Sequence, residues 1–114
     1  MIEPDLTGQT ALVTGSAKGV GRGLLLALAD RGADVAVHYR TSDDAASEVA
    51  DQAAGKDVQT TIAQGDVTDP EDVAAMFERI ESDLGTVDIL VNNVGAFAPH
   101  HWEDIDFATW NTVL

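Results

Sequence analysis

The sequence contains no cysteine, which excludes disulfides, thiolate metal sites and a cysteine nucleophile. Basic residues are scarce too, with six lysines and arginines against 20 aspartates and glutamates and a formal net charge of −14. Such a chain offers no basic surface to nucleic acid, and anionic membranes would repel it. We therefore expect neither nucleic acid nor a membrane among its partners.

Long apolar runs are also missing. No stretch approaches the roughly 20 apolar residues that cross a bilayer. The first residues lack the basic start and the apolar core of a signal peptide. With 114 residues, 45% of them hydrophobic, the chain is too apolar for a disordered acidic tail and has the length of one domain. These features predict a single folded domain with a cytoplasmic location.

The acid excess has its own pattern, because 14 of the 20 acids are aspartate and the lysines are only Lys18 and Lys56. Surface acid keeps a protein soluble, while its self-repulsion destabilises the compact state, a balance that halophilic proteins use. The pattern favours a halophilic protein of haloarchaeal type in a high-salt cytoplasm. An acidic protein of ordinary origin is the alternative.

Short apolar runs alternate with amphipathic stretches along the chain. The runs predict strands at 10–14, 35–39, 58–64 and 87–91. The stretches predict helices from about 20 to a stop at Gly32, from 42 to 54, from 70 to 84, and from about 106 onward. Short connections between alternating strands and helices imply right-handed βαβ units. The expected fold class is α/β, an incomplete Rossmann-type doubly wound parallel sheet with about four strands in the order 3-2-1-4.

Two of these helices carry clear signals. In the first, we expect Val20, Leu24, Leu25 and Leu28 to share the buried face. In the third, Asp69 and Pro70 suit the N-cap and the first helical position, and Gly85 suits the end. The apolar spacing of this third helix predicts one inward face, formed by Val73, Met76, Phe77, Ile80 and Leu84.

A glycine-rich turn follows the first strand directly. Gly15 permits a sharp exit from the strand, and Gly19 removes a Cβ where backbone and ligand approach closely. Gly21 lets the next helix pack on the sheet, with its N-terminus toward a pyrophosphate. The turn lacks the Lys-Ser/Thr ending of a nucleoside-triphosphate loop. Three glycines alone also fit an ordinary strand–helix turn, but their place between a strand and an apolar helix favours phosphate binding.

Three motifs make the resemblance specific: Thr14-Gly15-x-x-x-Gly19-x-Gly21, Asp66-Val67 after the third strand, and Asn92-Asn93-Val94-Gly95 after the fourth. In this order the chain resembles the short-chain dehydrogenase/reductase family, most of all its 3-oxoacyl-carrier-protein-reductase type. Val94 departs mildly from the family's alanine, and Asn92 fits a structural role as well as a functional one. The resemblance implies a set of cofactor-binding residues: Gly15, Ser16, Lys18, Gly19, Val20, Gly21, Tyr39, Arg40, Asp66, Val67, Asn93 and Gly95.

The choice of nicotinamide cofactor depends on the end of the second strand. An NAD site places an acid about 20 residues after the glycines, but no acid occurs between Asp34 and Asp43. Arg40 can instead pair with a 2′-phosphate, and Lys18 is at a second position that similar NADP enzymes make basic. We therefore expect NADP(H) to be favoured over NAD(H). The alternative is that both side chains are ordinary surface cations.

No catalytic residue can be assigned. The family resemblance implies a tyrosine acid with a lysine four residues later, but the sole tyrosine, Tyr39, has Asp43 there. Trp110 to Leu114 match a pattern that precedes a catalytic asparagine in the family. We therefore expect residues 1–114 to be the NADP-binding half, without the catalytic half, of an oxidoreductase for a small carbonyl or alcohol substrate. The complete enzyme would be a dimer or homotetramer. The alternative is a non-catalytic dinucleotide-binding remnant or interaction protein.

Other polar groupings receive structural interpretations. The adjacent residues His100 and His101 could suggest a metal site, but the sequence has no cysteine and no suitably spaced carboxylate to complete one. We expect both histidines in a loop near a substrate entrance. We predict no metal site. Asp43 and Asp44 are expected to begin a helix, where acids favour the positive end of its dipole.

Overall fold

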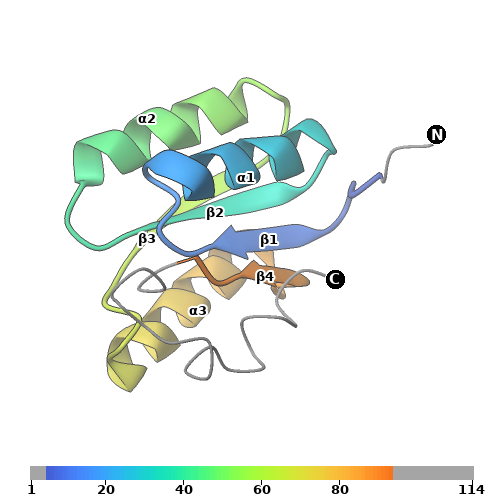
Figure 1. Cartoon of the computed structure of the whole chain (residues 1–114). Helices are drawn as coiled ribbons and strands as arrows, with labels where there is room; N and C mark the ends of the chain where they lie inside the picture. Colours follow the sequence, from blue (N-terminus) through green and yellow to red (C-terminus); the bar gives the residue numbers. More distant parts are fainter. Residues whose placement is uncertain (1–4, 94–114) are drawn as a thin grey trace, which may run out of the picture.

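The computed structural model describes residues 5–93 (Figure 1). The expected loop after residue 91 and the helix from about 106 fall largely beyond this range. Within it, strands and helices alternate throughout, as the hydrophobic pattern predicts. In chain order the elements are β1 (Thr10–Val13), α1 (Gly19–Asp30), β2 (Asp34–Tyr39), α2 (Asp43–Ala54), β3 (Thr60–Gln64), α3 (Pro70–Leu84) and β4 (Ile89–Val91).

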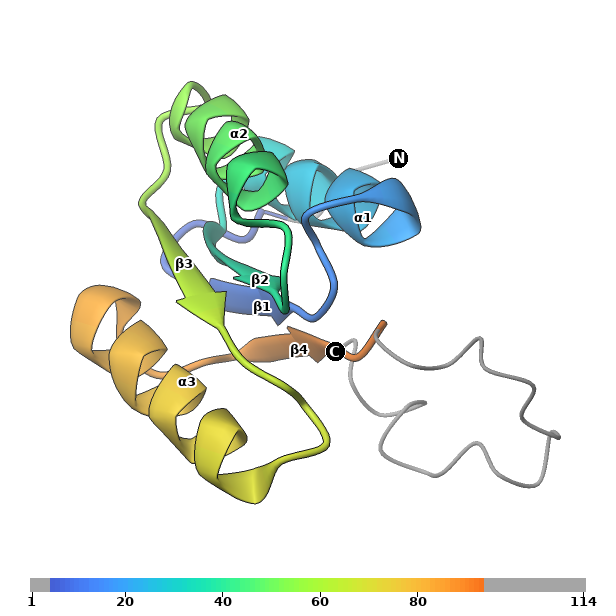
Figure 2. The same cartoon turned by 90° about the vertical axis from the view of Figure 1, so that its left-hand side faces the viewer.

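The four strands form one parallel sheet in the order β3-β2-β1-β4. α1 and α2 cover one face, and α3 covers the other (Figures 1 and 2). This arrangement is a Rossmann-type doubly wound sheet, so the predicted fold class and strand order are confirmed.

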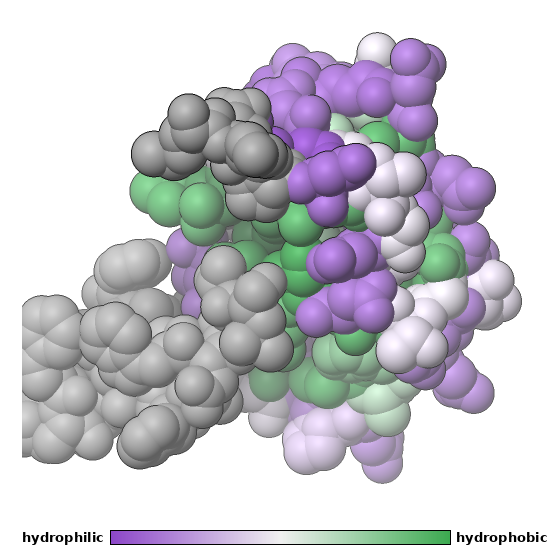
Figure 3. Space-filling view, turned by 90° about the vertical axis from the view of Figure 1, so that its right-hand side faces the viewer, coloured by the Kyte–Doolittle hydropathy of each residue, from purple (hydrophilic) through white to green (hydrophobic). Residues whose placement is uncertain are grey.

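Side chains of alternate strand residues point to opposite faces and build two cores. The core beneath α1 and α2 includes Val13, Val35 and Val37, whereas the core beneath α3 includes Leu12 and Ala36. Because both faces of the sheet are covered, the central strands β1 and β2 are buried almost continuously, whereas the edge strand β3 alternates between buried and more exposed residues. The face opposite to that in Figure 2 shows apolar side chains between polar ones (Figure 3).

α3 follows the sequence prediction closely. The Asp69 carboxylate caps the helix by accepting from the Glu71 N–H at 2.9 Å, and Pro70 is the first residue of the helix. Gly85 ends it with φ +96°, a left-handed conformation that glycine tolerates. Met76 and Ile80 are buried, as their spacing predicts.

The predicted inner face of α1 is partly wrong. Val20 and Leu24 are 69% and 40% exposed. The residues one position later along the helix, about 100° further around its axis, turn inward instead. The buried residues of α1 are Gly21, Leu25 and Ala29. A count of apolar residues gives no weight to Gly21, although its small size is what lets the helix approach the sheet.

Strand beginnings also differ from the prediction. β3 starts at Thr60 rather than Val58, and β4 starts at Ile89 rather than Val87. Before β3, the left-handed residue is Asp57, with φ +64°, while Gly55 itself stays right-handed at φ −65°. The helix therefore ends in an additional turn that shortens the strand. Among residues 5–93, no helix is both long and apolar enough to span a bilayer.

Candidate functional site

The carboxyl ends of the four parallel strands meet at one edge of the sheet (Figure 2). In open α/β sheets, ligands bind at this edge, where the strand order reverses. Here the reversal lies at β1, which has β2 on one side and β4 on the other. The three sequence motifs follow β1, β3 and β4, so the fold gathers them at this edge.

The turn between β1 and α1 depends on two glycines in the left-handed region. Gly15 has φ +63° and Gly19 has φ +61°, a conformation that other residues adopt only with strain. Nothing lies within 4 Å of a Cβ added at Gly19. The backbone of the turn is therefore open to the outside at Gly19, as close approach by a ligand requires.

The N-terminus of α1 is suited to an anion. Lys18 is its N-cap residue, has extended backbone angles and makes no side-chain capping hydrogen bond. The amides of Gly19, Val20 and Gly21 belong to the first turn, where a helix provides no acceptor. No acid occupies this turn, so the positive end of the helix dipole is available to phosphate oxygens.

Gly21 joins the turn, the helix and the end of β4. A Cβ at this position would overlap the carbonyl oxygen of Gly15 and lie 2.7 Å from Nδ2 of Asn93. The predicted role of Gly21, close packing of the helix, thus has a specific partner on each side. Asn93 is tied down as well, because its N–H donates to Oγ1 of Thr14 at 2.8 Å.

His38 organises this edge, and sequence analysis missed it. Its Nδ1 accepts from the Gly15 N–H at 2.8 Å, and its Nε2 lies 2.7 Å from the carbonyl oxygen of Gly65. Its backbone N–H donates to Oγ of Ser16 at 2.9 Å, and its carbonyl accepts from the Ser16 N–H at 3.1 Å. Burial lowers the pKa of His38, which favours the neutral ring. The available signal was an ionisable residue inside a continuously apolar strand.

Ser16, one of the predicted cofactor-binding residues, takes part in the same hydrogen bonds to His38. Its side chain is fully buried, and both its hydroxyl oxygen and its N–H are bonded to His38. In the described structure, Ser16 fastens the turn to β2. A direct contact between Ser16 and a cofactor stays a prediction.

Arg40 and Asp66 lie together beyond β2 and β3. Nη2 of Arg40 is 3.4 Å from Oδ2 of Asp66, and the arginine side chain is 71% exposed. Thr68 donates its N–H and its hydroxyl to Oδ1 of Asp66. These two hydrogen bonds lower the pKa of the Asp66 carboxyl, and the positive charge of Arg40 lowers it by a smaller amount. The pair borders a polar hollow of about 370 Å³, lined by Arg40, Thr41, Gln64, Gly65, Asp66 and Asp72.

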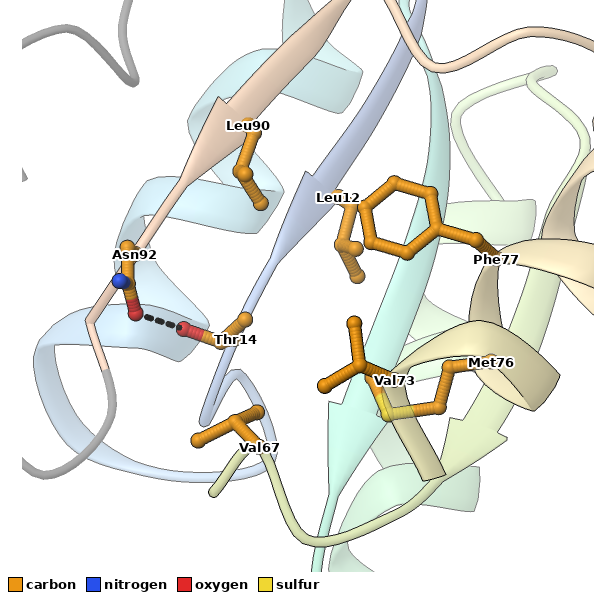
Figure 4. Close-up of a pocket in the computed structure, with 8 residues that line it drawn as sticks. All are labelled: Leu12, Thr14, Val67, Val73, Met76, Phe77, Leu90 and Asn92. Carbon is orange, nitrogen blue, oxygen red and sulfur yellow. Dashed lines mark hydrogen bonds between the residues drawn. The ribbon is translucent and has the colours of Figure 1, made fainter. Parts of the chain in front are cut away.

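Val67 belongs to a different cavity from its neighbour Asp66. The second cavity, of about 150 Å³, is mostly apolar and lies between the sheet and α3 (Figure 4). At one side of it, the hydroxyl of Thr14 lies 3.2 Å from Oδ1 of Asn92. The lining residues are Leu12, Thr14, Val67, Val73, Met76, Phe77, Leu90 and Asn92. The Asp66-Val67 pair is therefore divided between two cavities.

The remaining predicted residues have simpler surroundings. Lys18 and Val20 are exposed beside the glycine turn. Tyr39 is half-buried and packs against the core beneath α1 and α2. Gly95, His100 and His101 fall outside residues 5–93. Within that range, no group of three or more histidines and carboxylates could hold a metal ion.

Comparison with known proteins supports the motif analysis. The sequence profile of the family described as short chain dehydrogenase matches residues 9–114. The chain is 40% identical over 87 residues to the 3-oxoacyl-[acyl-carrier-protein] reductase FabG of Staphylococcus aureus (strain Mu50 / ATCC 700699). That alignment covers 76% of this chain and 35% of the relative, so the chain spans about a third of the length of this protein.

Solved structures agree with the fold. A short-chain type dehydrogenase/reductase from Mycobacterium marinum has a TM-score of 0.76 and 37% identity, over 96% of this chain and 44% of its own. The landomycin C-6 ketoreductase LanV with bound NADP and rabelomycin has a TM-score of 0.74 and 36% identity, over 96% and 47%. The profile match, the sheet and the motifs at its edge agree: the chain belongs to the short-chain dehydrogenase family.

Proposed function

We propose that this chain provides the cofactor-binding part of an oxidoreductase that uses NADP(H) to interconvert a small carbonyl compound and an alcohol. The observation that carries the cofactor preference is the exposed Arg40 guanidinium at the polar hollow, directly after β2. No acid lies between Asp34 and Asp43 to bind ribose hydroxyls as in NAD sites. The NADP-bound ketoreductase LanV, similar in fold, supports the same choice.

The residues present fit such a cofactor. The first-turn amides of α1 would hold the pyrophosphate, and Arg40 with Lys18 would hold the 2′-phosphate. The charged Asp66 carboxylate is an acceptor suited to the adenine amino group, and Asn93 and Gly95 would lie on the ribose side. When bound, the nicotinamide supplies the hydride for carbonyl reduction.

Electrostatics make the two cations more important than their number suggests. The chain carries −14 overall, so its mean field repels an anionic cofactor. The Arg40–Asp66 ion pair is largely exposed, at 3.4 Å, and pairs of this kind contribute little energy. Arg40 can therefore turn from Asp66 to a phosphate at small cost, and a phosphate bound there has a local counter-charge.

Carbonyl reduction also needs a proton donor near the developing alkoxide. The sole tyrosine of the sequence, Tyr39, packs against the core beneath α1 and α2 and is followed four residues later by Asp43. We infer that residues 1–114 bind the cofactor without completing the reaction. Purified chain mixed with NADPH and simple ketones should oxidise no more NADPH than protein-free buffer does, and sustained turnover would overturn this inference.

Calorimetric titration of the purified chain with NADPH and with NADH measures the two dissociation constants and tests the cofactor preference. NADPH should bind more tightly, and Arg40→Asp should weaken NADPH binding at least tenfold, since a charge-assisted hydrogen bond contributes about 1.5–3 kcal/mol. Arg79→Asp is the matched control, because it makes the same charge change on an exposed arginine of α3. Equal affinities for the two cofactors in the unmodified chain would contradict the proposed preference.

A further inference from the structure

His38 is unusual among the ionisable residues of this fold. It is 1% exposed, and in the range 5–93 it is the sole ionisable side chain that is fully buried. It lies at the carboxyl end of β2, on the same face of the sheet as Ala36, and pairs with Ala63 of β3. Neither the apolar pattern of β2 nor the cofactor motifs predict an imidazole at this position.

The partners of the ring fix its protonation state. The Gly15 N–H is a donor, so Nδ1 must present a lone pair to it; the Gly65 carbonyl is an acceptor, so Nε2 must carry the hydrogen. The ring is therefore the neutral Nε2–H tautomer. A proton added at Nδ1 would face the Gly15 N–H and remove its acceptor.

The two partners belong to different parts of the candidate site. Gly15 opens the phosphate-binding turn in a left-handed conformation, at φ +63°. Gly65 precedes Asp66 and is packed closely against α3, because an added Cβ would lie 2.5 Å from Sδ of Met76. The imidazole therefore bridges the segment that follows β3 and the glycine-rich turn.

Within residues 5–93, the ring nitrogens of His38 bond to backbone groups and not to a charged side chain. The adjoining segments provide Lys18 in the turn, Arg40 after β2, Asp66 after β3 and Asp72 on α3. Arg40 pairs with Asp66, and a carboxylate oxygen of Asp72 accepts from the Asp66 N–H at 2.9 Å. The causes of the lowered His38 pKa are burial and, opposing it, the Gly65 carbonyl. No counter-ion among residues 5–93 therefore stabilises a protonated ring.

We propose that His38 is a positioning residue for cofactor binding, and that only its neutral form holds the phosphate-binding turn in place. This inference rests on the proposed function, because the turn is assigned to the cofactor there. It adds a dependence on pH: as His38 gains a proton, the turn loses its acceptor at Gly15 and cofactor affinity falls.

Two substitutions separate the two hydrogen bonds. His38→Asn places an amide oxygen near the position of Nδ1, so it keeps an acceptor for Gly15 and does not titrate. His38→Gln reaches the position of Nε2, so it keeps a donor for Gly65 but leaves Gly15 without its acceptor. At about pH 8, we expect NADPH affinity to stay within about threefold in the Asn variant and to fall about tenfold in the Gln variant.

The pH dependence needs a correction for the cofactor, because a phosphate monoester itself titrates near pH 6. NADPH affinity is therefore measured for the unmodified chain and for His38→Asn at each pH, and the ratio is taken, since the phosphate contributes equally to both. NADPH affinity of the unmodified chain relative to His38→Asn should stay constant above about pH 6.5. It should fall as the pH drops through the lowered folded pKa of His38. A ratio that stays constant across the pH at which the His38 ring gains its proton, while both proteins bind NADPH, would overturn the proposal.

A measurement without cofactor distinguishes this proposal from the proposed function. In nuclear magnetic resonance spectra of the unliganded chain, the Gly15 amide should shift and lose protection from exchange with the same midpoint as the His38 ring. If NADPH does not bind at any pH, the proposed function fails, and the Gly15 amide alone decides whether His38 positions the turn. A Gly15 amide that does not respond while His38 gains a proton would overturn that role.

Discussion

The hydroxyl oxygen of Thr14 accepts a hydrogen bond from the backbone N–H of Asn93 at 2.8 Å. The two residues are 79 positions apart in the chain, yet each belongs to a motif that the sequence predicts at the cofactor site. The contact joins the end of β1 to the end of β4. It therefore sets where the asparagine motif begins relative to the glycine-rich turn.

Replacing Thr14 by valine tests this contact. The variant keeps the branched shape but leaves the Asn93 N–H without its acceptor, which should lower the free energy of unfolding by about 1–3 kcal/mol. Urea denaturation measures the change. Thr14→Ser is the control, because it keeps the hydroxyl and should be the more stable of the two variants. A valine variant as stable as the unmodified chain, beside a destabilised serine variant, would show that the methyl group and not the hydrogen bond matters here.

Two glycines of α1 make a matched pair. Gly21→Ala should destabilise the fold and weaken NADPH binding, because its Cβ would overlap Gly15 and crowd Asn93. Gly23→Ala adds a Cβ with nothing within 4 Å, so helix propensity alone should stabilise the fold by about 0.5–1 kcal/mol. Thermal unfolding and NADPH titration measure both variants. A Gly21→Ala protein as stable as Gly23→Ala would contradict the close packing.

The sequence predicts this fold well where burial is periodic. α3 follows its apolar spacing, its Asp69 cap and its Gly85 end, because each of these signals acts within one helix. Apolar spacing places Val20 and Leu24 on the wrong face of α1, because the contact of Gly21 with Gly15 and Asn93 decides how that helix lies. The spacing of apolar residues within one helix does not predict which distant segments the helix will contact.

The residues of the candidate site also differ in whether local sequence patterns predict them. Gly15, Gly19 and Arg40 could be found from the sequence because their spacing follows directly from the ends of two strands. His38 could not, since its partners Gly15 and Gly65 meet it only after three strands have been placed side by side. The separation of Asp66 from Val67 likewise depends on α3, which forms the cavity that Val67 enters.

Stability should depend on pH through His38. Burial lowers its pKa in the folded chain below the ordinary value near 6.5, so the unfolded chain binds more protons in the interval between the two values. The contribution of neutral His38 to the free energy of unfolding is thus complete above about pH 6.5. It is lost as the pH falls through the pKa of His38 in the folded chain. Urea midpoints between about pH 7.5 and pH 5 should fall more steeply for the unmodified chain than for His38→Asn. Parallel curves would contradict this assignment.

Salt should stabilise the chain, as we propose for a halophilic protein. With a net charge of −14, repulsion acts over about 30 Å at 0.01 M salt but only about 3 Å at 1 M. The melting temperature should therefore rise steeply with KCl. A variant with Asp51→Asn, Glu78→Gln and Glu81→Gln, all exposed positions, carries −11 and should respond less. A melting temperature that is flat or falls with KCl would remove the halophilic interpretation.

β4 is the edge strand on its side of the sheet in the described part of the chain. Ile89 and Val91 are buried, and Leu90 lines the apolar cavity beneath α3. An apolar edge strand offers unpaired backbone groups to another chain. We therefore expect the purified chain to associate with itself through β4, with a mass that rises with concentration in light scattering.

Leu90→Lys tests this expectation, because a charged side chain on an edge strand opposes pairing between sheets. It should reduce the concentration-dependent mass, whereas Leu24→Lys, on an exposed position of α1, makes the same chemical change away from the edge and should leave the mass unchanged. Far-ultraviolet circular dichroism establishes that both variants keep the fold. Light scattering and circular dichroism are both measured in molar KCl, because at low salt the negative net charge alone would oppose association. A monomer at every concentration in the unmodified chain would show that the edge of β4 is already protected, and an equal effect of the two lysines would assign the association to another surface.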